Sequence, residues 1–128
     1  MNDIFYLTFS SFFLNNLSNA KVCITDSFIP AISCVKHKKD LKIIQIWHSM
    51  GAIKKFAYQS IGTESGRDDR TAKILNMHRN YNYIISGSNE MTKYFSKAFD
   101  YDKKYFLNYG LPRMDYLIQN ENKLKNEA

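Results

Sequence analysis

A histidine, followed by small residues and then by two lysines, is the part of this sequence best suited to chemistry. The segment reads QIWHSMGAIKKF (residues 45–56), and His48 ends an apolar run. Imidazole ordinarily titrates near neutrality, so His48 could serve as an acid or a base. Gly51 would let the backbone approach a ligand closely, and Lys54 and Lys55 could meet phosphate charge. Taken alone, these residue types favour the alternative, a structural histidine beside solvated lysines.

A second candidate is GLPRMD (residues 110–115). Gly110 follows an apolar run and Pro112 fixes a backbone angle, so the segment predicts a rigid turn at the start of a helix. Arg113 could bind a phosphate or tie one domain to another, and Asp115 could cap the helix. A purely structural turn with a salt-bridged arginine fits these residues equally well.

The elements that must position these residues are short strands alternating with helices. Apolar, β-favouring runs predict four strands, at 20–25, 41–48, 81–88 and 105–110. The second run is nearly continuous, which is typical of a parallel strand covered on both faces. The alternation predicts an α/β fold, a Rossmann-like parallel sheet with flanking helices. Ligands of such sheets gather at the carboxyl ends of the strands, which here carry His48, Ser86–Ser88 and Gly110–Arg113.

Helical patterns fill the intervals between these runs. The apolar segment from Ile4 to Leu17 is too short to span a bilayer and lacks a basic start, so it indicates a core helix instead of a targeting signal. A helix over 89–99 would begin near Asn89. Its apolar face would comprise Met91, Tyr94, Phe95 and Phe99. A last helix is expected from residue 114 onward. We expect His78 to pack within a helix that precedes the third strand. His37 is expected to be exposed.

Composition narrows the class of protein. With 128 residues, 45% of them hydrophobic, the chain can form one folded domain and is not a disordered polymer. Lys and Arg number 18 against 12 Asp and Glu, a net charge of +6 that either solvates the surface or attracts polyanions. Cys23 and Cys34 form no disulfide framework, and no spacing suggests a metal site, so we expect a reducing, cytoplasmic compartment and neither metal nor cofactor. Residues 94–106 interleave aromatics with lysines, a pattern that suits core burial better than nucleic-acid stacking.

Three ordered segments carry a family resemblance: QIWHSMGAIKKF, then NMHRNYNYIISGS, then KAF with GLPRMDYL. In this order they resemble the CDP-glycerol:poly(glycerophosphate) glycerophosphotransferases of Gram-positive wall polymer synthesis, from about residue 20 onward. The resemblance implies a GT-B fold, in which two Rossmann-like domains enclose the active site. It also implies transfer of glycerol phosphate from CDP-glycerol to a hydroxyl of a teichoic acid chain, with release of CMP.

The resemblance assigns roles residue by residue. It implies that His48, preceded by Trp47, is the catalytic base. Ser49 and Met50 stand where relatives often carry Gly-Thr, and Gly51 follows them. The substrate-binding residues that it implies are Ser49, Gly51, Lys54, Lys55, Arg113 and Asp115, the last two belonging to a motif that also includes Gly110 and Pro112.

The same resemblance implies an organisation and partners. Residues 1–120 would form a partial acceptor-side domain, and residues 121–128 a charged tail leading toward an absent donor-binding domain, so the 128-residue chain alone is expected to be inactive. The partners would be CDP-glycerol, a glycerol phosphate polymer or lipid-linked primer, and the anionic inner surface of the cell membrane, without nucleic acid. The alternative is a basic, non-catalytic module that binds nucleic acid or an anionic membrane through the cluster Lys36–Lys42.

Overall fold

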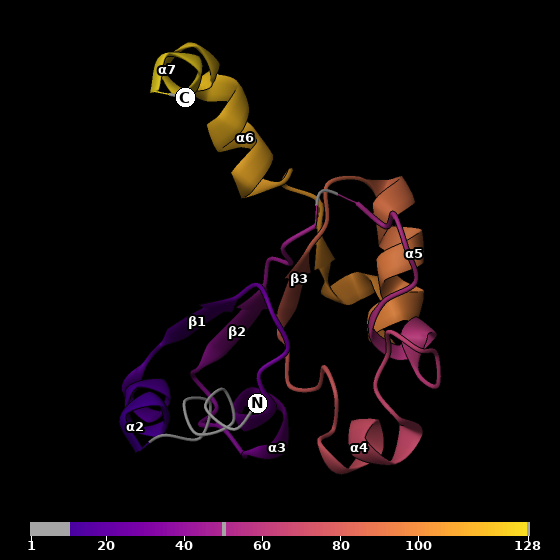
Figure 1. The fold of residues 1–128 in the computed structure, drawn as a ribbon. Helices are drawn as coiled ribbons and strands as arrows, with labels where there is room; N and C mark the ends of the chain where they lie inside the picture. The colour runs from indigo at the N-terminus through magenta and orange to yellow at the C-terminus, as the bar shows by residue number, and fades with distance from the viewer. Residues whose placement is uncertain (1–10, 50, 128) are drawn as a thin grey trace.

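Four short parallel strands form the sheet around which the chain is arranged (Figure 1). The computed structural model describes residues 11–49 and 51–127. The strands are β1 (Val22–Thr25), β2 (Lys42–Gln45), β3 (Tyr83–Ile85) and β4 (Phe106–Leu107), and they lie side by side in chain order. Every neighbouring pair is parallel. The predicted α/β class, with a Rossmann-like parallel sheet and flanking helices, is confirmed.

The connections between the strands carry the helices. They are α3 (Pro30–Cys34), the 3-10 turn η1 (Ala57–Ser60), α4 (Asp69–Ile74), α5 (Asn89–Phe99) and the 3-10 turn η2 (Lys103–Tyr105). Consecutive strands are neighbours throughout, and parallel crossovers share one hand, so the connections fall on one face of the sheet. The buried core lies on that face, where Ile43 and Ile84 of the sheet meet Phe95 and Phe99 of α5.

The opposite face of the sheet is much less covered, which corrects the prediction that the second strand is enclosed on both faces. Val22 and Ile24 of β1 are 53% and 63% exposed, and Ile44 beside them is only half-buried. Register places these three side chains and Tyr83 on the same face. Strand β2 is apolar because it lies between β1 and β3 in the sheet, and not because helices cover both of its faces.

Helix α5 spans the predicted residues, Asn89–Phe99, and begins one residue after its N-cap. The hydroxyl of Ser88 accepts a hydrogen bond from the Met91 backbone N–H at 3.2 Å, which satisfies one of the free donors of the first turn. The predicted apolar face is partly wrong, because Tyr94 is 57% exposed. The buried face consists of Thr92, Phe95, Ala98 and Phe99.

The N-terminal prediction is only partly covered by the described residues. Helix α2 runs over Ser11–Asn19 and buries Leu17, whereas the start of the predicted helix at Ile4 lies outside the described part of the chain. Within residues 11–49 and 51–127, no helix has the length and apolarity needed to cross a bilayer.

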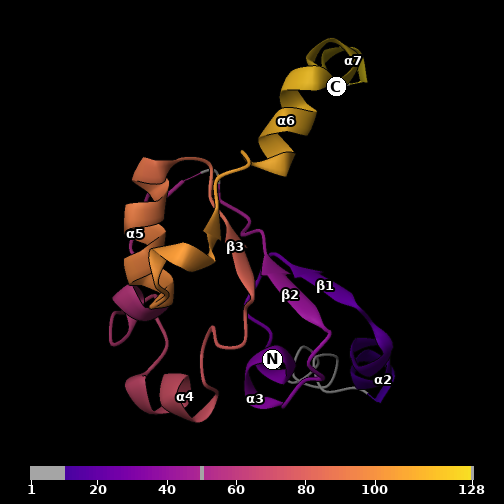
Figure 2. The same cartoon turned by 180° about the vertical axis from the view of Figure 1, so that it is seen from behind.

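The last two helices lead away from the sheet (Figures 1 and 2). Helix α6 (Pro112–Gln119) has Pro112 in its first turn, as predicted, and α7 (Glu121–Glu127) shows that the charged tail is helical. Helix α6 has no buried residue, and it exposes Tyr116, Leu117 and Ile118.

Replacing Phe99 by alanine tests the placement of the core on the helical face. Phe99 is fully buried and its ring lies edge-on to Phe56 and Phe95, so Phe99→Ala should lower the free energy of unfolding by about 3–5 kcal/mol. Tyr94→Ala, on the exposed side of the same helix, should change it by less than about 1 kcal/mol. Urea denaturation of both variants measures the difference. Equal losses would mean that α5 packs on another face.

Candidate functional site

His48 lies where β2 has ended, at the carboxyl edge of the sheet, and its side chain is exposed. Its Nδ1 is 2.9 Å from the backbone oxygen of Asp26, in the segment that follows β1. A carbonyl oxygen only accepts hydrogen bonds, so Nδ1 must carry the proton. In the neutral ring the lone pair is then on Nε2, which is the arrangement required of an acceptor of protons.

The buried amide of Gln45 holds the turn that leads to His48. Its Oε1 accepts the backbone N–H of Trp47 at 2.8 Å, while its Nε2 is 3.2 Å from both the Ser27 carbonyl oxygen and the Tyr81 hydroxyl oxygen. One side chain therefore joins the segments that follow β1 and β2. It also holds Trp47 at a φ of 56°, a left-handed conformation that is costly for a residue with a Cβ. Sequence reasoning missed Gln45, although a polar residue within an apolar run was the available signal.

Aromatic stacking connects His48 to the core. The Trp47 ring lies 4.2 Å from the His48 ring and 4.5 Å from the Phe56 ring, centroid to centroid, and both pairs are within 34° of parallel. Phe99 meets the same indole edge-on, at 5.3 Å and 89°. The imidazole therefore rests on an aromatic support that continues into the buried face of α5.

A small pocket of about 60 Å³ joins His48 to the GLPR turn. Its lining includes Ser49, Leu111 and Arg113, and Arg113 Nη1 donates to the His48 backbone oxygen at 3.3 Å. Gly110 has a φ of +87°, which glycine adopts without steric cost, so the predicted turn is built as expected. The structure therefore brings two of the segments singled out in the sequence into one place.

Two larger recesses open beside His48 and include the predicted lysines. One, of about 240 Å³, is lined by His48, Lys54 and Lys55, and the other, of about 310 Å³, by His48, Gly51 and Lys54. A Cβ added to Gly51 would meet nothing within 4 Å, so the protein itself does not require glycine there. Ser49 uses its hydroxyl to donate to the Gly51 carbonyl oxygen at 3.0 Å, and Met50 between them lies outside the described residues.

Asp115 does not cap α6, contrary to the prediction. The N-cap position belongs to Leu111, and no side chain bonds to the free N–H groups there. Asp115 instead lies against Gly110, with a carboxylate oxygen 3.2 Å from where a Cβ of Gly110 would be. Asp115 is the fourth residue after the N-cap, so its side chain is one turn too far along the helix to serve that purpose.

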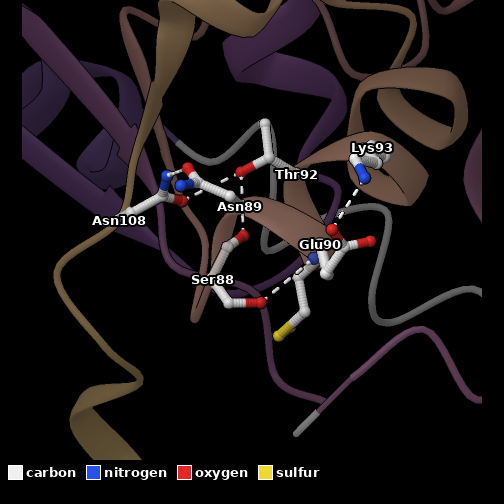
Figure 3. A network of polar contacts seen from close by, with 7 residues as sticks. Ser88, Asn89, Glu90, Thr92, Lys93 and Asn108 are labelled. Carbon is white, nitrogen blue, oxygen red and sulfur yellow. Dashed lines mark hydrogen bonds and ion pairs between the residues drawn. The ribbon is translucent and has the colours of Figure 1, made fainter.

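Ser86–Ser88, also predicted from their position after a strand, form a separate polar network at the start of α5. Figure 3 shows the part of this network around Ser88, Thr92 and Asn108. The buried Thr92 hydroxyl lies 2.9 Å from both the Ser86 hydroxyl and the Asn108 amide oxygen. Asn108 in turn donates to the Asn89 amide oxygen. These groups satisfy one another, so the network joins the ends of β3 and β4, and none of its residues lines the recesses beside His48.

The other two histidines, His37 and His78, lie outside the pocket between His48 and the GLPR turn and contact the fold itself. His37 is half-buried, not exposed as predicted, and its Nε2 lies 2.6 Å from the Ile32 carbonyl oxygen. His78 is buried as predicted, but it follows α4 in a turn and has a φ of 58°. Burial, aided by the positive charge of Arg67, lowers the pKa of His78 from 6.5 to about 3, so the ring is neutral at physiological pH.

The neutral His78 completes the buried network around Gln45. Its Nδ1 is 3.0 Å from the Tyr81 hydroxyl, and burial raises the pKa of Tyr81, which keeps that hydroxyl protonated. Tyr81 can therefore accept from Gln45 Nε2 and donate to His78 Nδ1. No cluster of three or more His, Cys, Asp or Glu side chains that could hold a metal ion occurs among the described residues.

The sequence was compared with protein families, and the family of CDP-glycerol:poly(glycerophosphate) glycerophosphotransferases matches residues 3–128. A teichoic acid ribitol-phosphate primase of Bacillus spizizenii is 32% identical over 108 residues, which are 84% of this chain and 28% of that protein. A teichoic acid glycerol-phosphate primase of Bacillus subtilis is also 32% identical, over 83% of this chain and 28% of its own length. The chain thus spans less than a third of these relatives.

The fold was compared with solved structures. A structure of the wall teichoic acid polymerase TagF superposes with a TM-score of 0.72 and 24% identity, over 91% of this chain and 28% of that one. At this level of identity the likeness concerns the fold alone. The elements of that polymerase that correspond to this sheet and its helices therefore make up only part of the polymerase structure.

Replacing Gln45 by leucine tests its hold on the site. Gln45→Leu removes three hydrogen-bond contacts and leaves the buried Trp47 N–H without its acceptor, so we expect a loss of about 2–4 kcal/mol in the free energy of unfolding. The matched substitution Gln119→Leu, on exposed α6, should cost less than about 0.5 kcal/mol. Urea denaturation measures both. A loss at Gln45 no larger than at Gln119 would contradict the assigned role.

The low pKa of His78 predicts a specific pH dependence of stability. The unfolded chain takes up a proton near pH 6.5, whereas folded His78 does so only near pH 3, so the unfolded state binds more protons between these values. Stability should therefore fall as pH decreases through this window, by up to about 1.4 kcal/mol per pH unit from this group. His78→Gln should flatten the curve below pH 6.5 in chemical denaturation measured from pH 8 to pH 4.5. An unchanged slope would contradict the burial of a neutral His78.

Proposed function

Because the chain belongs to the CDP-glycerol:poly(glycerophosphate) glycerophosphotransferase family, we propose that it forms the acceptor-activating part of an enzyme of wall polymer synthesis. That enzyme transfers glycerol phosphate from CDP-glycerol to a hydroxyl of a teichoic acid-type polymer and releases CMP. One observation carries the proposal: the bond from His48 Nδ1 to the Asp26 carbonyl oxygen leaves Nε2 as the exposed basic nitrogen.

The proposed reaction is a phosphoryl transfer to an alcohol. The acceptor hydroxyl oxygen forms a bond to the phosphorus that carries glycerol, and the bond from that phosphorus to the bridging oxygen breaks. CMP leaves with the electron pair, and the hydroxyl proton passes to His48 Nε2. An unactivated alcohol is a weak nucleophile, so a positioned base raises the rate, by roughly a hundredfold or more. The Asp26 carbonyl keeps the ring in the required tautomer and orientation.

The cations around His48 support the same function. Phosphoryl transfer depends mainly on positioning and on stabilising charge at the phosphate oxygens. Lys54 and Lys55 line one recess with His48, and Arg113 lines a separate pocket that also includes His48. We assign these three side chains to substrate phosphates, and Ser49 and Gly51 to the loop that shapes the site.

The proposed organisation follows the resemblance of the chain to its longer relatives. Residues 1–120 are assigned to the acceptor-side domain of a GT-B arrangement, and residues 121–128 lead toward the part that binds CDP-glycerol. Because a lipid-linked primer is among the proposed acceptors, we also propose a peripheral position at the inner face of the cell membrane. The excess of basic residues, a net charge of +6, would favour such an anionic surface.

Substitution of His48 tests the proposal in the complete protein that carries this chain, assayed with CDP-glycerol and a glycerol phosphate primer. His48→Asn should lower kcat for CMP release by about a hundredfold or more and change KM little, because the base acts in the transition state. Parallel assays with CDP-ribitol would determine which polyol phosphate is transferred.

His37→Asn is the matched control for this experiment. His37 also bonds to a backbone carbonyl oxygen, but it precedes β2, at the opposite edge of the sheet from His48. This variant should keep the wild-type rate once its folding has been verified by circular dichroism. Near-normal CMP release by His48→Asn would disprove the assignment of the base.

A further inference from the structure

The recess of about 240 Å³ beside His48 contains a cation that the proposed base chemistry does not use. Besides Lys54 and Lys55, Arg67 lines it, and no Asp or Glu is part of its lining. Its two histidines are the exposed His48 and the buried His78, which is neutral. The recess therefore concentrates three positive charges against no negative one, and its volume is many times what a single water requires.

Arg67 has no anionic partner within the described part of the chain. Its guanidinium carbon lies over the Phe28 ring, 5.1 Å from the ring centroid, and its side chain makes no hydrogen bond or ion pair within that part of the chain. The other arginines near the core are engaged, since Arg79 pairs with Asp100 at 2.6 Å and Arg113 donates to His48. This cation–π contact leaves the N–H donors of Arg67 available.

A closely bonded loop holds Arg67 at the recess. The Gly62 N–H donates to the Arg67 carbonyl oxygen at 3.1 Å, and Gly62 has a φ of +74°. The Gly66 N–H donates to the Thr63 carbonyl oxygen, and a Cβ on Gly66 would lie only 1.7 Å from the Ser60 carbonyl oxygen. Glycine at position 66 is therefore required for the loop to close, and the position of Arg67 is determined by backbone contacts.

We propose that this recess binds a phosphate group of the polyol-phosphate acceptor, with Arg67 as the principal ligand and Lys54 and Lys55 beside it. A planar guanidinium can donate two parallel hydrogen bonds to a phosphate. Binding the chain's last phosphodiester there would place the following terminal hydroxyl next to His48. The inference rests on the proposed function and adds to it a binding residue that selects acceptors ending in a phosphodiester-linked unit.

Binding measurements separate this inference from the proposed function. The probes for the 128-residue chain are a synthetic tri(glycerol phosphate), CDP-glycerol and a single-stranded DNA trinucleotide, each titrated by NMR at fixed ionic strength. Arg67→Gln should weaken binding of tri(glycerol phosphate) by about tenfold. Arg70→Gln, three residues later and outside the lining, should change it by less than about twofold. Arg67→Lys keeps the positive charge but cannot donate two parallel hydrogen bonds, so its loss of affinity should lie between those of the other two variants.

Each outcome decides for or against the subsite. Equal effects of Arg67→Gln and Arg70→Gln, no binding by the wild type, or a larger effect on CDP-glycerol than on tri(glycerol phosphate) would overturn it. If the DNA trinucleotide bound as tightly as tri(glycerol phosphate), and if this binding also depended on Arg67, the proposed selectivity of the recess for polyol phosphate would be overturned. Thermal unfolding checks that Arg67→Gln stays folded, and Gly66→Ala, which displaces the loop while keeping all three charges, should weaken binding as well. A His48→Asn protein that stays active would refute the base and leave these binding results unaffected.

Discussion

The buried amide of Gln45 is the interaction on which the described site depends. It joins the segment after β1, the turn after β2 and the hydroxyl of Tyr81 through three hydrogen-bond contacts. A group this deeply buried must have partners, because an unpaired amide would cost a large part of a small domain's stability. The requirement that Gln45 be satisfied thus sets the left-handed turn at Trp47, and that turn presents His48 to the carbonyl oxygen of Asp26.

Sheet topology explains why the candidate site is at this edge. Parallel strands end at the same edge, so the segments after β1, β2 and β4 converge there and bring Asp26, His48 and Arg113 together. Aromatic contacts then couple the edge to the core, from Phe99 through Trp47 to His48. His48 and the buried face of α5 are therefore parts of one packed unit, and core packing contributes directly to the orientation of the imidazole.

The sequence allowed the strands and α5 to be predicted because their signals are local. Apolar runs identified the strands, and the spacing of apolar residues over 89–99 identified α5. The exposure of β1 and of Tyr94 could not be predicted, because burial depends on which elements cover a surface. The turn at His78 and the position of Asp115 depend on tertiary contacts in the same way. Arg67 could not be identified from the sequence, since its proximity to Lys54 arises from the folded loop between β2 and α4 and not from sequence spacing.

The tautomer of His48 tests the central claim most directly. Long-range ¹H–¹⁵N correlation spectra of the folded chain, recorded at a pH where the imidazole is neutral, distinguish a proton on Nδ1 from one on Nε2. The hydrogen bond to the Asp26 carbonyl oxygen predicts that Nδ1 carries the proton and that Nε2 gives the signal of an unprotonated nitrogen. A spectrum with the proton on Nε2 would contradict the account, because the exposed nitrogen would then be unable to take a proton from an acceptor hydroxyl.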